Sequence, residues 1–155
     1  MNKQISNVSY EKLKQDYKMY DDMNKSLQQD LEKAIVDRDP TREMQIAREG
    51  SAVEKKMKEI EAEMKIVEAD AANIASLKAE LEQLKAEAEE NMKAYQANLK
   101  KSSNNQDELR AINEEEMSLV YYGSTLEKTI KKLEERISRA AGAIESSANE
   151  NQPSL

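Results

Sequence analysis

The sequence contains no cysteine and no histidine, and among the aromatic residues it lacks tryptophan and phenylalanine. Without cysteine there are no disulfide bonds and no thiolate metal sites. Without histidine the chain has neither the imidazole ligand of most zinc sites nor the usual base of a catalytic triad. It also has no glycine-rich loop that could hold a phosphate group. We therefore expect no catalytic residues, no metal site and no cofactor, and we do not expect an enzyme or a small-molecule substrate.

The sequence is also poor in the side chains that fill a broad hydrophobic core. Of its 155 residues, 38% are hydrophobic, many of them alanine or methionine, and 35% are charged. Such a chain cannot build a wide layered interior. Its abundant Ala, Glu, Lys, Leu, Met and Gln residues are good helix formers, and this composition is typical of coiled coils. We predict an all-α fold, an elongated coiled coil of three long helical segments.

The net charge is −7, from 24 basic and 31 acidic residues that are interleaved along the chain. This balance disfavours nucleic acid, which proteins bind by neutralising its phosphates. The acidic run Glu114, Glu115 and Glu116 lacks the loop of oxygen ligands that calcium needs. No apolar run approaches the ~20 residues that cross a bilayer, and the polar start MNKQISNVSY lacks the apolar core of a signal peptide. We expect a soluble intracellular protein, cytoplasmic or nuclear, without membrane insertion.

The first segment, residues 1–38, has apolar and aromatic residues at alternating spacings of three and four, which is typical of a heptad helix. Its a seats are Tyr10, Tyr17, Asn24 and Leu31, and its d seats are Leu13, Tyr20, Leu27 and Ala34. Asn24 either fixes the register of paired helices or marks a weak, hydrated part of the seam. Pro40 suits the first position of a helix, so we expect Asp39 to cap a second helix there.

The second segment, residues 39–101, is predicted as one long heptad helix in a different register. Its d seats are Ile46, Val53, Ile60, Val67, Ile74, Leu81, Ala88 and Tyr95, and its a seats are Gly50, Met57, Met64, Ala71, Lys78, Lys85, Met92 and Leu99. Where lysine occupies the a seat, leucine stands one residue earlier, at Leu77 and Leu84. The apolar stripe is therefore wider than a two-stranded seam needs, which indicates a helix with two neighbours.

Residues 102–105 are expected to form a joint or a turn, after which Asn105 and Glu108 resemble a capping box. A third heptad helix over residues 106–145 follows, with its seam at Leu109, Ile112, Glu116, Leu119, Gly123, Leu126, Ile130, Leu133, Ile137, Ala140 and Ile144. Residues 146–155 have nothing to bury, so we expect a disordered tail. Two arrangements stay open at this point. Either the chain continues as a jointed rod, or an antiparallel hairpin pairs Leu84 with Gly123 and Leu77 with Ile130.

A weak internal repeat aligns residues 43–61 with residues 116–134 and superimposes two of the three glycines. In both copies the pattern is Gly-Ser-x-x-Glu, at Gly50–Ser51 and at Gly123–Ser124. The pattern predicts either a hinge, in which serine caps a new helix, or an unbroken helix whose glycine lets a neighbouring backbone approach closely. The heptad phase continues across both glycines, and a lone helical glycine costs only ~1 kcal/mol, which favours the unbroken helix.

The stretch LVYYGSTLEK, residues 119–128, concentrates apolar and aromatic side chains. It is either part of a helix with more than one buried side or a docking site for a partner helix, with Tyr121 and Tyr122 as anchors. The residues that we expect to take part in helix–helix interaction are Leu77, Leu84, Leu119, Val120, Tyr121, Tyr122, Leu126 and Ile130.

Thin apolar stripes of this kind cannot be buried by a solitary helix. We expect a structural protein that self-associates or assembles with partner coiled coils, as a scaffold or tether in a cytoskeletal, spindle or kinetochore, or trafficking assembly. Two alternatives stay open. The segment LEKTIKKLEERISRAAGAI could bind a membrane surface as an amphipathic helix, although acidic residues offset its lysines and arginines. The chain could also be a small adaptor that folds only on its partner.

Overall fold

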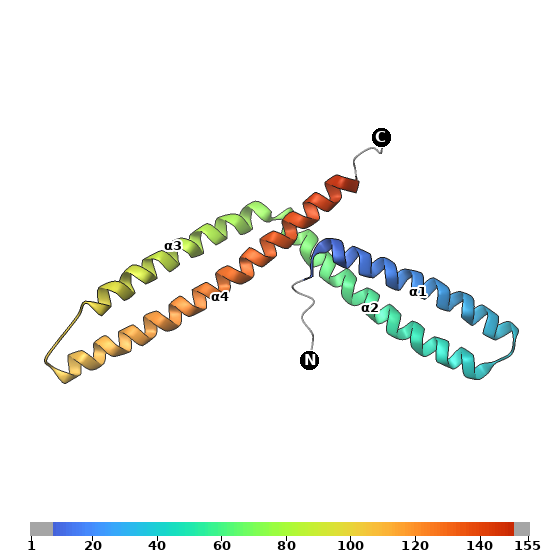
Figure 1. Cartoon of the computed structure of the whole chain (residues 1–155), viewed down its shortest axis with the longest axis horizontal. Helices are drawn as coiled ribbons and strands as arrows, with labels where there is room; N and C mark the ends of the chain where they lie inside the picture. The colour runs from blue at the N-terminus through green and yellow to red at the C-terminus, as the bar shows by residue number, and fades with distance from the viewer. Residues whose placement is uncertain (1–7, 151–155) are drawn as a thin grey trace. The chain divides into compact units, whose positions relative to one another are not determined.

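The computed structural model describes residues 8–150, and this part of the chain is helical except for its turns. The helices are α1 (Tyr10–Val36), α2 (Pro40–Ala72), α3 (Ile74–Leu99) and α4 (Gln106–Glu150) (Figure 1). The predicted all-α class is therefore confirmed, but with four helices in place of three. The helices form two compact units, one of α1, α2 and the end of α4 from Arg139, the other spanning residues 73–138.

In the first unit α1 and α2 lie side by side as an antiparallel hairpin (Figure 1). The turn between them is a Schellman motif, in which the Asp39 amide donates to the Ala34 carbonyl and the Arg38 amide to that of Ile35. Arg38 takes the left-handed conformation of this motif, with φ of 54°. The chain then enters α2 at Pro40, where the Asp39 carboxylate accepts from the Arg42 amide at 3.1 Å. The motif VDRDP thus reverses the chain within three residues, Asp37 to Asp39.

Tyrosines of α1 hold the two helices together by donating to carboxylates of α2. The Tyr10 hydroxyl lies 2.7 Å from Oε1 of Glu68, and that of Tyr17 lies 2.9 Å from Oε1 of Glu61. The core of the unit consists of Tyr10, Leu13, Ile60, Val67 and, from α4, Ala143. All but Ala143 occupy heptad seats that the sequence identifies, so the α1–α2 seam follows the heptad pattern.

The end of α4 packs into this unit through polar contacts as well. The Arg139 guanidinium donates to the Val8 carbonyl at 3.1 Å and to Glu63 at 3.3 Å. Ser146 is buried, donates to Glu11 at 2.8 Å and accepts from Lys14 at 3.0 Å. The expectation of a helix ending at residue 145 and a disordered tail from residue 146 is thus wrong as far as Glu150; residues 151–155 lie outside the described part.

The buried face of α4 also changes at this end. Ile144, an expected seam residue, is 47% exposed, whereas Ala143 is buried. Here α4 packs among side chains of both α1 and α2, and small residues face them. The heptad pattern does not specify this change.

The single central helix expected over residues 39–101 is in fact two helices, separated at Asn73. Buried or half-buried positions alternate by three and four up to Ala71, but Ile74 and Leu77 then follow at two successive steps of three. In a regular α-helix, two successive steps of three fall short of two full turns, so the positions that follow would rotate away from the buried face. The break at Asn73 accompanies this phase change, and it accounts for the early placement of Leu77 and Leu84 relative to the a seats.

In the second unit α3 and the preceding part of α4 form a second antiparallel hairpin (Figure 1). Residues 100–105 make its turn. Asn105 caps α4, because its side-chain oxygen accepts from the Asp107 amide at 2.9 Å. Glu108 does not complete the expected capping box; its carboxylate accepts instead from the Ser103 hydroxyl. Of the two arrangements left open by the sequence, the chain within this unit forms the antiparallel hairpin and not the jointed rod.

Two asparagines of α3 set the register of this hairpin. The Asn98 amide donates to the Ile112 carbonyl, and the Asn91 amide donates to the Leu119 carbonyl, both at 3.1 Å. One heptad further from the turn, the same register places Leu84 level with Leu126, and two heptads further it places Leu77 level with Leu133. The expected pairing of Leu84 with Gly123 and Leu77 with Ile130 is therefore shifted along α4, because the α3 side chain that lies beside Gly123 is that of Asn91.

Candidate interaction surface

Most of the residues that the sequence identifies for helix–helix interaction are occupied within the second hairpin. Leu77 and Leu126 are buried, with 7% and 5% of their surface exposed. Leu84, Leu119 and Ile130 are half-buried. These side chains form the seam between α3 and α4, so they are not available to another chain while the hairpin is intact.

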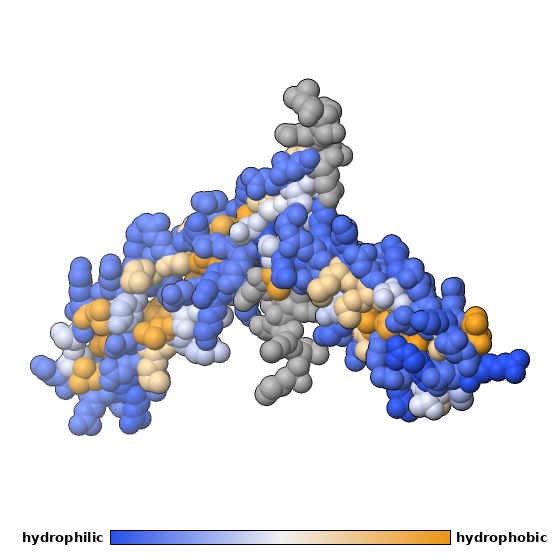
Figure 2. Space-filling model, turned by 45° about the vertical axis from the view of Figure 1, so that its right-hand side comes forward, coloured by the Kyte–Doolittle hydropathy of each residue, from blue (hydrophilic) through white to orange (hydrophobic). Residues whose placement is uncertain are grey.

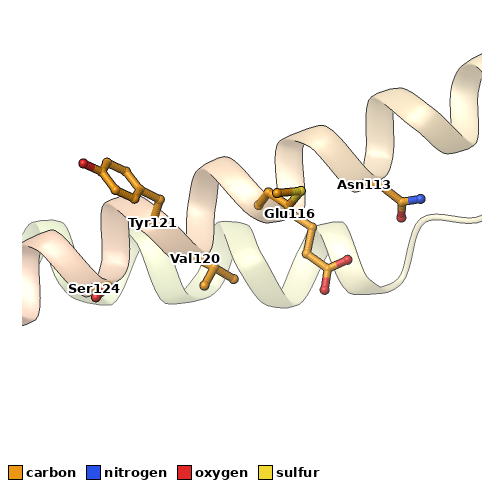
Figure 3. A pocket seen from close by; sticks show the side chains of 6 residues that line it. Asn113, Glu116, Val120, Tyr121 and Ser124 are labelled. Carbon is orange, nitrogen blue, oxygen red and sulfur yellow. The ribbon is translucent and has the colours of Figure 1, made fainter.

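A second apolar group on α4 points away from this seam. Met117, Val120 and Tyr121 have 73%, 53% and 77% of their surface exposed. They border an open groove of about 600 Å³, whose lining residues are Asn113, Glu116, Met117, Val120, Tyr121 and Ser124. All six belong to α4 (Figure 3), so this is a depression along one helix and not an enclosed cavity for a small molecule.

The two adjacent tyrosines have different roles in the structure. The Tyr122 hydroxyl donates to Oε2 of Glu87 on α3 at 3.2 Å, which raises the pKa of Tyr122 above its ordinary value. This residue therefore belongs to the hairpin. Tyr121 is exposed, and its side chain leaves α4 in a different direction from that of Val120 (Figure 3). Of the two expected anchors, Tyr121 is the more exposed, at 77% against 47% for Tyr122.

Sequence reasoning missed Asn91 and Asn98, which contact the α4 backbone in this unit. Asn98 is 1% exposed, and its Oδ1 accepts no hydrogen bond within the described residues. The signal was present, because Leu77, Leu84, Asn91 and Asn98 follow one another at heptad spacing. The expected a seats beside them, Met92 and Leu99, are 54% and 55% exposed.

Neither glycine of the internal repeat is a hinge, since α2 runs through Gly50 and Ser51 and α4 runs through Gly123 and Ser124. Their surroundings differ. A Cβ atom added at Gly50 would meet nothing within 4 Å, whereas one at Gly123 would lie 2.7 Å from Nδ2 of Asn91. Gly123 thus makes room for a side-chain amide, where we expected the close approach of a backbone.

A smaller open groove of about 470 Å³ lies on the α1–α2 hairpin, lined by Met23, Ser26, Leu27, Glu49, Ala52 and Val53. Asn24 on the same stretch of α1 is half-buried. Figure 2 shows hydrophobic patches on each hairpin within a mainly hydrophilic surface.

Among residues 8–150 there is no group of three or more acidic side chains placed to hold a metal ion. None of the described helices is both long and apolar enough to cross a membrane. Comparison with protein-family models, curated proteins and solved structures finds no match to this chain.

Proposed function

We propose that this chain is a structural interaction protein of coiled-coil type, which self-associates or joins partner helices as a scaffold or tether subunit. Its association surface is the exposed apolar group of α4, Met117, Val120 and Tyr121. A cytoskeletal, spindle or kinetochore, or trafficking assembly is the kind of setting in which such a subunit works.

The observation that carries this proposal concerns α4 around Leu119, where a polar side chain lies in the seam and large apolar side chains lie on the outer side. On the inner side of α4, the seam at this level contains the amide of Asn91. On the outer side, the large apolar side chains Met117, Val120 and Tyr121 are exposed. Exposing three large apolar residues while a polar one fills the seam gives up hydrophobic stabilisation, and a partner helix on the outer face would recover it.

A membrane-surface role has less support. In the segment LEKTIKKLEERISRAAGAI, the side chains of Leu126, Leu133, Ala140 and Ala143 are buried. A membrane would have to compete with protein packing for that face, whereas the outer group of α4 is already exposed.

Photo-crosslinking tests the proposed surface. A photoreactive amino acid placed at Tyr121 in the full chain is expected to capture a helical protein or a second copy of the chain in the cells that express it. The matched control is the same group at Lys93, whose side chain is 72% exposed on α3. Equal capture from both positions, or none from Tyr121, would remove the proposal.

A further inference from the structure

Besides its apolar group, the outer side of α4 carries an ordered pattern of charge. We define the outer stripe as Arg110, Glu114, Met117, Tyr121, Ser124, Lys128, Lys131 and Glu135, spaced alternately by four and three along α4. Every one of these residues is exposed. Within the described residues, Arg110, Glu114, Lys131 and Glu135 form no ion pair with another part of the chain.

We propose that the outer stripe is a self-pairing surface, on which α4 of a second copy lies antiparallel. This inference rests on the proposed function and identifies the partner. In an antiparallel pair centred between Tyr121 and Ser124, Arg110 of one copy lies level with Glu135 of the other. Glu114 lies level with Lys131 in the same register. Two-fold symmetry repeats both matches, so four oppositely charged pairs flank a centre in which Tyr121 lies level with Ser124 and Met117 with Lys128.

The charge pattern selects this orientation and register. A parallel pair in register would bring Glu114 beside Glu114 and Lys131 beside Lys131, which is repulsive. Shifting the antiparallel pair by one heptad in one direction places Arg110 level with Lys128, which has the same charge. Shifting it in the other direction places Glu114 level with Ser138, which is uncharged. The first of these shifted registers places Met117 level with Tyr121, but only the central register matches both charge pairs.

The area also bears on the strength of the pair. The stripe runs for about 40 Å along one helix, and Met117 and Tyr121 are its large apolar residues, with Val120 adjacent to it. Such an interface is smaller than the roughly 1,200–2,000 Å² of stable complexes. We therefore expect a weak dimer, with a dissociation constant above about 10 μM at low salt, that weakens further as salt screens the charges.

Reversing charges provides a sharp test by sedimentation equilibrium of the full chain. Glu114→Lys and Lys131→Glu each turn two attractive pairs into repulsive ones, so each variant alone should dimerise about tenfold or more weakly than the parent chain. Mixing the two variants should restore dimerisation. One variant then carries lysine at both positions and the other carries glutamate at both, so every pair between them is attractive. The double variant should also dimerise. Glu90→Lys on α3 has the same charge change as the first variant and should behave like the parent chain.

A monomeric parent chain at high concentration and low salt would overturn self-pairing, and so would single variants that still dimerise. Failure to regain dimers on mixing would overturn the antiparallel register. These outcomes are distinct from failure of the proposed function. If the chain is monomeric but Tyr121 captures another protein in the crosslinking experiment, the surface binds a different helix and only the self-pairing is wrong.

Discussion

The two hairpins of this chain consist of helices of similar composition but differ in the side chains that are most deeply buried between them. In the α1–α2 hairpin the most enclosed large side chains are Leu13 and Val67, each 1% exposed. In the α3–α4 hairpin the most enclosed is Asn98, also 1% exposed. Buried apolar side chains contribute stability but do little to fix how two helices align along each other. A buried asparagine restricts this alignment at a cost in stability.

The difference lies in the side chains that the seam of each hairpin encloses. The most enclosed positions of the first hairpin are apolar, and its core includes Ala143 of α4. The second hairpin instead places two asparagines in its seam, where their amides donate to carbonyls of α4. Both hairpins leave large apolar side chains exposed, such as Val36 on the first and Met117 on the second. We infer that the seam of the first hairpin contributes mainly stability, whereas the asparagines of the second fix the alignment of its helices. The following predictions test that contrast, starting with the largest expected effect.

Leu13→Ala should lower the free energy of unfolding by about 2–4 kcal/mol, because it opens a cavity in the core of the first unit. Denaturant unfolding followed by circular dichroism measures this loss. Leu99→Ala is the matched control, since Leu99 is 55% exposed, and it should change stability by less than about 0.5 kcal/mol. Equal effects of the two substitutions would show that the α1–α2 seam is not packed as described.

Asn98→Ala should destabilise the second hairpin by about 1–2 kcal/mol, through loss of the hydrogen bond to the Ile112 carbonyl and of buried packing. Hydrogen exchange of the α3 and α4 amides reports this effect locally. The amides of α1 should keep their protection at the end remote from α4. If exchange near the turn is unchanged, Asn98 does not hold the register.

The two glycines of the repeat should respond differently to alanine. Gly50→Ala should stabilise the chain by about 0.5–1 kcal/mol, because alanine is the better helix former and the added methyl group meets nothing. Gly123→Ala should give no such gain, because its Cβ displaces the Asn91 amide. In an Asn91→Ala background, Gly123→Ala should become stabilising. Thermal unfolding of the four variants forms the test, and equal gains at both glycines in the parent chain would contradict it.

Each hairpin also has a tyrosine that donates to a glutamate across its seam, Tyr17 to Glu61 and Tyr122 to Glu87. Each hydrogen bond raises the pKa of its tyrosine above 10.0. The contribution to stability is therefore complete below the unfolded-state pKa and is lost as the pH rises through the raised pKa. Glu61→Gln should lower the pKa of Tyr17 and leave that of Tyr122 unchanged, and Glu87→Gln should do the reverse. Chemical shifts of isotope-labelled tyrosine rings measure both.

Much of the fold follows from periodicity, and the all-α class is confirmed. The seats from Tyr10 to Ala34 on α1, and from Ile46 to Ala71 on α2, are all buried or half-buried. A heptad pattern identifies a face because the same spacing recurs over many turns. It does not identify the neighbour that covers the face, so the α1–α2 hairpin and the contribution of Ala143 were not predicted.

The remaining features depend on single residues. At the break at Asn73, the spacing of the apolar residues has two successive steps of three. The regular alternation of three and four continues on both sides, so the heptad pattern does not mark this position as a break. Asn91 and Asn98 were missed because the a seats beside them hold Met92 and Leu99, which are more apolar. Tyr121 and Tyr122 are adjacent in sequence, and only the cross-helix bond to Glu87 distinguishes the outward residue from the inward one.

The distance between two spin labels, attached at the same position in two copies of the chain, tests the association surface most directly. The chain has no cysteine, so a nitroxide label can be placed at Ser124→Cys or, separately, at Asn113→Cys and measured by pulsed electron paramagnetic resonance at low salt. Antiparallel pairing predicts labels within about one helical turn of each other along the axis at position 124, and about 30 Å apart at position 113. Equal distances at the two positions, or no coupling between copies at either one, would contradict pairing through the outer stripe of α4.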